Sequence, residues 1–252
     1  MLTETQFRKE LGRALKSKST LNHNIMRELL QPKKNPLLLR LFALHTYPLT
    51  RMFERYVAAL FYNCPLPTFR RDLATNLYEE VTGALSKTDG HLELMQKFLR
   101  AVGISDEEMA HHQPLPDTHK LIEFRRKLVE DPATYHRGAA AVMIASEGQT
   151  IQKEGGIAPH RMMAALYGLS EDDVQFFTVH AEEDVEHVRE GFDVVCAVCT
   201  TEAQQMEAIA TVRETLELFW NHYEGIQREY LRLGGVLSVE ELPRAALAGG
   251  EA

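Results

Sequence analysis

The stretch FFTVHAEEDVEHVREGF, residues 176–192, decides how the chain is interpreted. It contains His180, Asp184 and His187, spaced four and then three residues apart. On an α-helix this spacing stacks the three side chains on one face. The fully polar positions lie elsewhere on the helix: Glu182, Glu183, Glu186, Arg189 and Glu190. The sequence therefore places two imidazoles and a carboxylate at or within the inward face, a ligand set that suits a divalent transition metal. A solvated charged face is the alternative interpretation.

Composition limits the class of protein. The chain has 252 residues, 44% of them hydrophobic, and a formal net charge of -8. This favours one large domain with a full core, and an acidic chain without a basic stripe argues against nucleic acid as a partner. No apolar run approaches the ~20 residues of a membrane span, and the amino terminus has no signal-peptide pattern. Three cysteines, an odd number, do not suggest a disulfide framework, so we expect a cytoplasmic protein.

Helical periodicity runs through the whole chain, and the alternation expected of strands is missing. The longer segments are 3–17, 37–64, 67–86, 91–103, 118–130, 133–153, 171–199 and 202–233, and shorter ones lie at 21–30, after Ser105 and at 158–168. Ser105 and Ser170 are expected helix caps, and Pro48 is expected to bend or divide its helix. We predict an all-α, single-domain bundle of roughly eight helices over residues 1–237, with a flexible tail at 238–252.

The final helix and a cysteine pair give predictions about packing. Apolar residues recur every three or four positions along the final helix: Ile209, Val212, Leu216, Phe219, Tyr223, Ile226 and Tyr230. Cys196 and Cys199 form a CxxC motif, but they continue the helix begun before His180 instead of opening one after a strand. We therefore expect both thiols to pack as small hydrophobic groups.

Three further helix segments carry candidate ligands. Glu80 shares a helix face with Leu73 and Leu77, which points it inward and its neighbour Glu79 more outward. His91 begins the helix that follows. Glu147 is the single acid in the nearly uncharged stretch 138–152, where an unpaired carboxylate is expensive to bury.

Together these positions supply three carboxylates and three imidazoles: Glu80, His91, Glu147, His180, Asp184 and His187. Carboxylate-rich mixed sites in helical bundles hold two iron or two manganese ions. Two ferrous ions would outweigh the charge of the three carboxylates. A water, hydroxide or anionic substrate would then complete the site, and open positions would accept dioxygen.

Four of these stretches resemble a known family. They are NLYEEVTG (76–83), HLELMQKFLRAVGISDEEM (91–109), SEG (146–148) and the opening segment. They resemble the heme-oxygenase-like diiron oxidases, which are related in fold to the thiaminase-like TenA proteins and to the quinone-cofactor synthase PqqC. The closest pattern is that of the chlamydial protein associating with death domains (CADD) and its bacterial relatives. The resemblance covers about residues 15 to 230.

The resemblance implies a function and a set of ligands. Each of the six residues matches one metal ligand of the family, Glu80 by its place four after Asn76 and three before Gly83. Two Fe(II) ions, with manganese as an alternative, and dioxygen as co-substrate are implied. The implied reaction is the oxidation of a small amine, amino acid or carboxylate. Composition and hydropathy separately predict a protein that binds neither nucleic acid nor membrane. The family pattern is also compatible with a homodimer.

The sequence departs from the CADD pattern at positions linked to self-sacrificing chemistry. Met26 stands at the early tyrosine position, Ser146 replaces the tyrosine before the central glutamate, and Ile157 replaces a lysine, with Lys153 nearby but out of place. We therefore expect an external substrate. Tyr47 remains a candidate inward-facing catalytic tyrosine.

Two other functions are compatible with the fold. One is a cofactor-free TenA- or PqqC-like enzyme, although none of the three cysteines matches the expected nucleophile. The other is a non-enzymatic interaction protein. Among the remaining histidines, His45 and His222 are expected in the core or lining a pocket, and His23 in either place. His111 and His112 are expected to be solvated.

Overall fold

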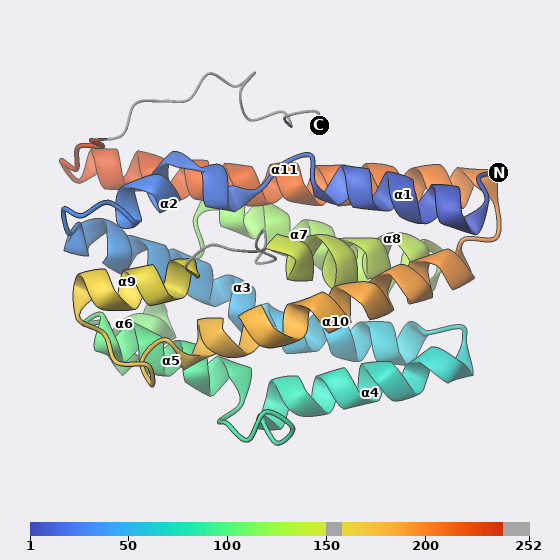
Figure 1. Ribbon diagram of the computed structural model, residues 1–252, viewed down its shortest axis with the longest axis horizontal. Helices are drawn as coiled ribbons and strands as arrows, with labels where there is room; N and C mark the ends of the chain where they lie inside the picture. Colours follow the sequence, from blue (N-terminus) through green and yellow to red (C-terminus); the bar gives the residue numbers. More distant parts are fainter. Residues whose placement is uncertain (150–157, 239–252) are drawn as a thin grey trace.

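Helices make up all the regular structure of the residues that the computed structural model describes (Figure 1). These residues are 1–149 and 158–238, without the side chains of residues 149 and 182–186. The α-helices are α1 (Glu4–Leu15), α2 (Asn24–Leu29), α3 (Pro36–Asn63), α4 (Pro67–Thr82), α5 (His91–Ala101), α6 (Asp106–His111), α7 (Pro116–Glu130), α8 (Tyr135–Ala139), α9 (Pro159–Tyr167), α10 (Gln175–Val198) and α11 (Glu202–Arg232). A π-helix, Ala140–Ser146, continues α8. The all-α prediction is confirmed.

The predicted number of helices is wrong. The described residues form eleven α-helices and one π-helix, twelve in place of roughly eight. Short helices such as α2 and α6 add to the number, and the segment predicted at 133–153 changes from α to π geometry after Ala139. Pro48 lies inside α3 but does not divide it. The tail predicted at 238–252 lies outside the described residues apart from Ser238.

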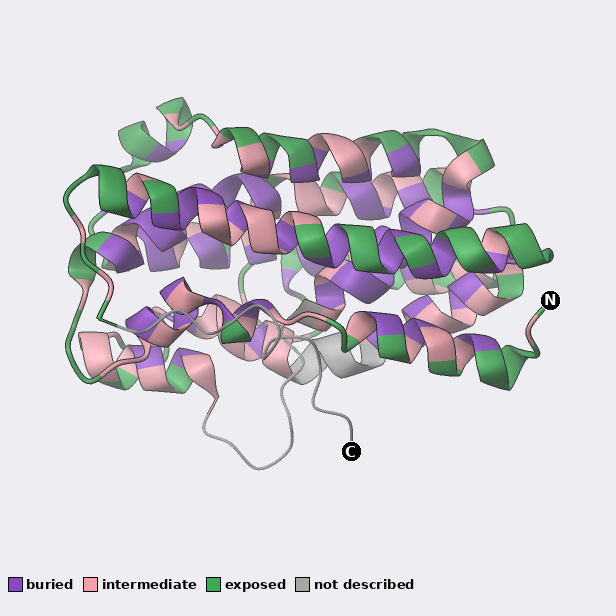
Figure 2. Ribbon diagram, turned by 90° about the horizontal axis from the view of Figure 1, so that it is seen from above, coloured by how far each residue is buried: buried purple, intermediate pink, exposed green. Residues whose placement is uncertain are grey.

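The helices form a bundle elongated along α11. Figure 1 shows α1 lying beside α11 on one side of the bundle, with α4 and α5 on the opposite side and α3, α7 and α10 between them. Figure 2 shows buried positions facing inward and exposed positions facing outward along the same helices. The predicted apolar stripe of α11 is buried, except for Tyr223, which is half-buried. No helix among the described residues is long and apolar enough to cross a membrane.

Local signals explain several helix ends. Ser105 and Glu108 form the predicted capping box of α6, each side chain bonding the backbone N–H of the other residue. The hydroxyl of Ser170 accepts a hydrogen bond from the N–H of Asp173 at 3.1 Å. It caps the turn at 171–174, and α10 itself begins at Gln175.

Both cysteines of the CxxC motif pack in the core beside α1 and α11, as predicted. Burial raises the pKa of Cys196 to about 11 and that of Cys199 to about 12. Both thiols therefore stay protonated at neutral pH and are poor nucleophiles.

Small residues allow other helices to approach the π-helix and α8 closely. A Cβ atom on Gly191 of α10 would lie 2.8 Å from the carbonyl oxygen of Met143, and one on Gly138 would lie 2.8 Å from that of Leu128 in α7. Both contacts are shorter than van der Waals separation and involve backbone atoms. The absence of these side chains therefore sets the spacing of α10 and α7 against this segment.

This spacing predicts a large effect of one methyl group. Gly191→Ala is expected to reduce the free energy of unfolding by about 1–3 kcal/mol, because backbone atoms must shift to admit the Cβ. Gly12→Ala is the matched control: it lies in α1 with nothing within 4 Å of the added Cβ, and is expected to stabilise by about 0.5–1 kcal/mol. Urea unfolding followed by circular dichroism measures both. A loss no larger for position 191 than for position 12 would contradict the close approach.

Candidate metal centre

Three of the six predicted ligands come together inside the bundle. Glu80 near the end of α4, His91 at the start of α5 and His180 on α10 each offer a ligand atom, and these atoms lie within 4.8 Å of one another. The Nδ1 atom of His91 lies 3.0 Å from Oε2 of Glu80, and the rings of His91 and His180 have centroids 4.7 Å apart. Two imidazoles and one carboxylate have the composition of the triad that holds ferrous iron in non-heme oxygenases.

The hydrogen bonding of His180 prepares it as a ligand. Its Nδ1 atom lies 2.7 Å from the carbonyl oxygen of Phe176. A carbonyl only accepts, so Nδ1 carries the proton and Nε2 keeps its lone pair for a metal. Burial lowers the pKa of His180 to about 4, with repulsion from a charged His91 adding to the effect and Glu80 opposing it. The imidazole is therefore neutral at physiological pH, which is the form that binds metals.

A second pair of predicted ligands lies nearby. Glu147, directly after the π-helix, is buried, and its Oε1 atom lies 3.7 Å from Nδ1 of His187 on α10. His187 is half-buried. The backbone of Asp184 lies in α10, one turn from both histidines of that helix, but its side chain is outside the described residues. Five of the six predicted ligands are thus described. They form a group of three and a group of two.

Glu79 corrects one prediction about direction. The helix phase placed it more outward than Glu80, but both are buried. The chain after α4 folds back, so that the carboxylate of Glu79 accepts hydrogen bonds from the N–H of Leu85 at 2.7 Å, the N–H of Ser86 at 3.3 Å and the hydroxyl of Ser86. Burial alone would raise the pKa of Glu79, but these hydrogen bonds and the nearby His91 lower it below its usual value. Glu79 holds the loop that leads to His91.

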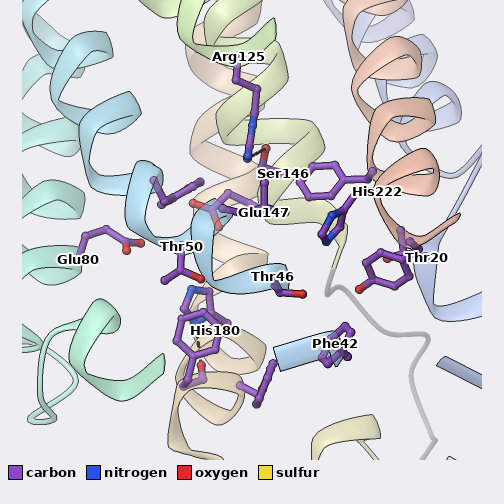
Figure 3. Close-up of a pocket in the computed structure, with 16 residues that line it drawn as sticks. Thr20, Phe42, Thr46, Thr50, Glu80, Arg125, Ser146, Glu147, His180 and His222 are labelled. Atoms are coloured by element: carbon purple, nitrogen blue, oxygen red, sulfur yellow. Dashed lines mark hydrogen bonds between the residues drawn. The ribbon is translucent and has the colours of Figure 1, made fainter. Parts of the chain in front are cut away.

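A cavity of about 170 Å³ opens beside the candidate ligands (Figure 3). Glu80, Glu147 and His180 line one part of it. Six large apolar side chains line much of the rest: Phe42, Leu49, Phe53, Phe176, Phe177 and Phe219. A second cavity of about 100 Å³ lies next to it, and Thr20, Phe42, Phe177 and Tyr223 line both. An apolar cavity with a few polar groups is typical of small-molecule sites.

Arg125 of α7 lines the main cavity and was not singled out from the sequence. It lies in the run Arg125, Arg126 and Lys127, in which composition does not show which residue faces inward. Helix phase was the available signal, since Arg125 lies on the face that buries Leu121 and Leu128.

Several histidines lie where the sequence placed them, and one does not. His45 is buried and His222 lines the main cavity, as predicted. His23 takes the core alternative: it caps α2 through Nδ1, which accepts from the N–H of Ile25 at 3.2 Å. His111 is exposed as predicted, but His112 is half-buried and packs on His45 with ring centroids 4.8 Å apart. The linker that carries His112 folds against α3.

Tyr47 is buried, as an inward tyrosine should be. Its hydroxyl accepts a hydrogen bond from Nε2 of Gln96 at 2.9 Å. The residues that line the two described cavities do not include it. A catalytic role for Tyr47 therefore stays a prediction.

Comparison with known proteins agrees with this geometry. The sequence profile of a family of iron-containing redox enzymes matches residues 40–220, so the chain belongs to that family and is an oxidoreductase. The 4-aminobenzoate synthase of Chlamydia pneumoniae is 24% identical over 212 residues, which are 84% of this chain and 90% of that protein. The resemblance seen in the sequence is confirmed.

Solved structures confirm the heme-oxygenase-like, TenA-like fold. A TenA homologue from Pseudomonas syringae pv. tomato superposes with a TM-score of 0.72 at 16% identity, covering 89% of this chain and 92% of its own. A CADD-like protein from Nostoc punctiforme gives a TM-score of 0.64 at 15% identity, covering 93% and 96% of the two chains.

The position of Glu79 predicts a structural effect. Glu79→Gln is expected to lower the free energy of unfolding by about 1–3 kcal/mol, because the amide group of glutamine brings hydrogen-bond donors to face the donors of Leu85 and Ser86. Glu214→Gln, at an exposed position in the middle of α11, is the control and should change stability little. Thermal and urea unfolding measure the difference. Equal stability of the two variants would refute the role of Glu79 in holding the loop.

His45 predicts a dependence of stability on pH. Burial and a charged His112 lower its pKa from 6.5 to about 4. Above pH 6.5 both folded and unfolded states are neutral at this site. As pH falls from about 6.5 to 4 the unfolded state takes up a proton and the folded state does not, so stability falls by up to about 3 kcal/mol.

His45→Asn should therefore reduce the loss of unfolding free energy between pH 7 and pH 4. Replacing the exposed His111 by asparagine should leave the same loss unchanged. Urea unfolding at several pH values measures both slopes. If the His45 variant keeps the wild-type slope, His45 is not buried in its neutral form.

Proposed function

We propose that the protein binds two ferrous ions at the six candidate ligands and uses dioxygen to oxidise a small amine, amino acid or carboxylate. The observation that carries the proposal is the meeting of Glu80, His91 and His180 from three helices, with ligand atoms within 4.8 Å of one another. Glu147 and His187 would supply part of the second metal position, with Asp184 as the further ligand. Manganese suits the same donor atoms.

The residues present fit such a group. Buried carboxylates and neutral imidazoles facing one another are costly unless a cation compensates them. The structure supports neutral His180 through its bond to Phe176, and the loop held by Glu79 fixes His91 at the first position of α5. When bound, ferrous iron would supply electrons to dioxygen.

The protein itself would position the substrate and keep bulk water away. The aromatic side chains of the main cavity form a largely apolar surface directly beside Glu80, Glu147 and His180. Such a surface strengthens electrostatic interactions at the ligands and limits side reactions with water.

The cavity supports an external substrate. The relative from Chlamydia pneumoniae is named a 4-aminobenzoate synthase. In this chain Ser146, where that pattern has tyrosine, lies on the wall of the main cavity, and Met26 lines the smaller one. Side chains without a phenol therefore stand at both positions, and the space beside the ligands is left for a small molecule.

The cofactor-free alternative has less support. A TenA-like mechanism needs a nucleophilic cysteine in the pocket, and no described residue lining either cavity is a cysteine. The remaining free cysteine, Cys64, is buried away from them and donates to the carbonyl of Leu66.

Iron content tests the proposal. Anaerobic loading with ferrous ammonium sulfate is expected to give about two irons per chain, because six ligand-type residues are available. Glu80→Gln and Glu147→Gln should each lose at least one iron and lower oxygen consumption at least about 100-fold, since neutral amides bind iron poorly. Glu107→Gln, exposed on α6, is the control and should keep both metals.

Mass spectrometry of metals and an oxygen electrode give the two readouts, and circular dichroism shows that each variant is folded. A folded wild-type protein that stays free of iron and manganese would defeat the proposal. Full iron content and activity in Glu147→Gln would show that Glu147 is not a ligand.

A further inference from the structure

Arg125 is a buried cation in the wall of the main cavity, and no described carboxylate forms an ion pair with it. Its side chain is 1% exposed. Nη1 donates a hydrogen bond to Oγ of Ser146 at 3.2 Å, while Nε and Nη2 donate to no acceptor among the described residues. Figure 3 shows the guanidinium reaching toward Ser146, next to Glu147.

Burial of this charge is only partly compensated by the protein. The guanidinium carbon lies 4.8 Å from the ring centroid of Tyr56 and 5.2 Å from that of Phe219, and both ring faces attract a cation. Burial lowers the pKa of Arg125, but arginine remains protonated in proteins. A buried charge is costly unless an opposite charge pairs with it, so an anion bound at Arg125 would compensate this cost.

The surroundings of Arg125 define the anion's shape. Among the described residues that line the main cavity, Arg125 is the one lysine or arginine, and the wall also includes five phenylalanines, Leu49 and Tyr223. Nε and Nη2 lie on one edge of the planar guanidinium, the arrangement that binds a carboxylate with two parallel hydrogen bonds. The apolar walls would accept a ring or a short alkyl chain, because a cavity of about 150 Å³ already holds benzene.

We propose that Arg125, supported by Ser146, binds the carboxylate of the substrate and holds its apolar body in the cavity beside the metal ligands. The substrate class is thus a small carboxylic acid with an aromatic or short alkyl body. This inference rests on the proposed oxidase function, which it narrows from amines, amino acids and carboxylates to acids. The carboxylate is recognised by Arg125 and not by the metal.

Two further polar groups in the cavity wall narrow the class of substrate. His222, 0% exposed, has no hydrogen-bond partner for Nε2 among the described residues, and neither has the hydroxyl of Thr46; both side chains line the cavity. Nδ1 of His222 is held by the hydroxyl of Thr118 at 2.8 Å. A substrate that carries one hydroxyl or amino group in addition to its carboxylate satisfies these atoms. Carboxylic acids that carry a hydroxyl or amino group should therefore bind more tightly than unsubstituted acids.

Calorimetric titration tests the inference under anaerobic conditions, with both metal-free and Mn(II)-loaded protein. The probes are benzoate, 3-phenylpropanoate and hexanoate, each paired with its primary amide, which has the same shape without the charge. 4-Hydroxybenzoate and 4-aminobenzoate are compared with benzoate. The variants are Arg125→Gln and Arg125→Met. Arg126→Gln is the control on the same helix, where Arg126 pairs with Glu123 and Glu130.

We expect at least one acid to bind about ten-fold or more tightly than its amide, in both metal states. Both Arg125 variants should lose this preference, and Arg126→Gln should keep it. If the Arg125 variants do not fold, Arg125→Lys replaces them, and its preference should be reduced because lysine lacks the planar fork. The substituted benzoates should bind more tightly than benzoate.

Equal binding of every acid and its amide would overturn the inference. A preference for acids that persists in the Arg125 variants would also overturn it. So would a preference seen only with Mn(II), because the carboxylate would then be bound by the metal. If the protein takes up no iron but still prefers acids over amides, Arg125 is a carboxylate-binding residue and the proposed oxidase function is rejected. If the protein binds iron as expected but shows no preference for acids, the carboxylate site is rejected and the proposed oxidase function stands.

Discussion

Burying carboxylates and imidazoles against one another is the constraint on which the arrangement of this bundle depends. Four separate segments, α4, α5, α10 and the π-helix with the turn after it, deliver Glu80, His91, His180 and Glu147 to the same interior region. Three of these segments carry a contact that fixes the candidate ligand: the loop held by Glu79 for His91, the bond to Phe176 for His180, and the close packing of Gly191 on the π-helix before Glu147. The fold thus gathers buried charges that a bound metal ion would balance.

The main cavity joins this group of ligands to a second, positively charged point. Glu80, Glu147 and His180 lie on one part of its wall, and Arg125 lies on another, next to Ser146. A molecule that ion-pairs at Arg125 is held in one orientation, so only certain of its atoms face the metal ligands. Under the proposed function, orientation of this kind would make the oxidation selective for certain bonds of the substrate.

Periodicity predicted the helices and the inward placement of most candidate ligands, because both depend on local sequence. The i, i+4, i+7 spacing placed His180 and His187 correctly on the inward side of α10, and the face shared with Leu73 placed Glu80. Local patterns failed where the chain folds back on itself. Burial of Glu79 depends on the loop at 83–90, and burial of His112 depends on a linker packing against His45.

The change from α to π geometry after Ala139 was also beyond local patterns. It occurs in a run of small and apolar residues whose propensities do not distinguish the two helix types, and α10 and α11 pack closely on it. The inward direction of Arg125 could not be predicted for a related reason. Its identity as the inward member of a basic run depends on the helix facing α7, so tertiary packing, not composition, selected it.

The side chains that line both cavities would control the size of molecule that the protein admits. Four residues line both the space of about 170 Å³ and the space of about 100 Å³, and Phe42, Phe177 and Tyr223 are the large ones. Replacing one of them by a smaller residue would merge the chambers and admit longer molecules, while every metal ligand and Arg125 stayed in place. Under the proposed function, the residues that limit substrate length would therefore differ from those that hold the metal, and evolution could change the first set without changing the second.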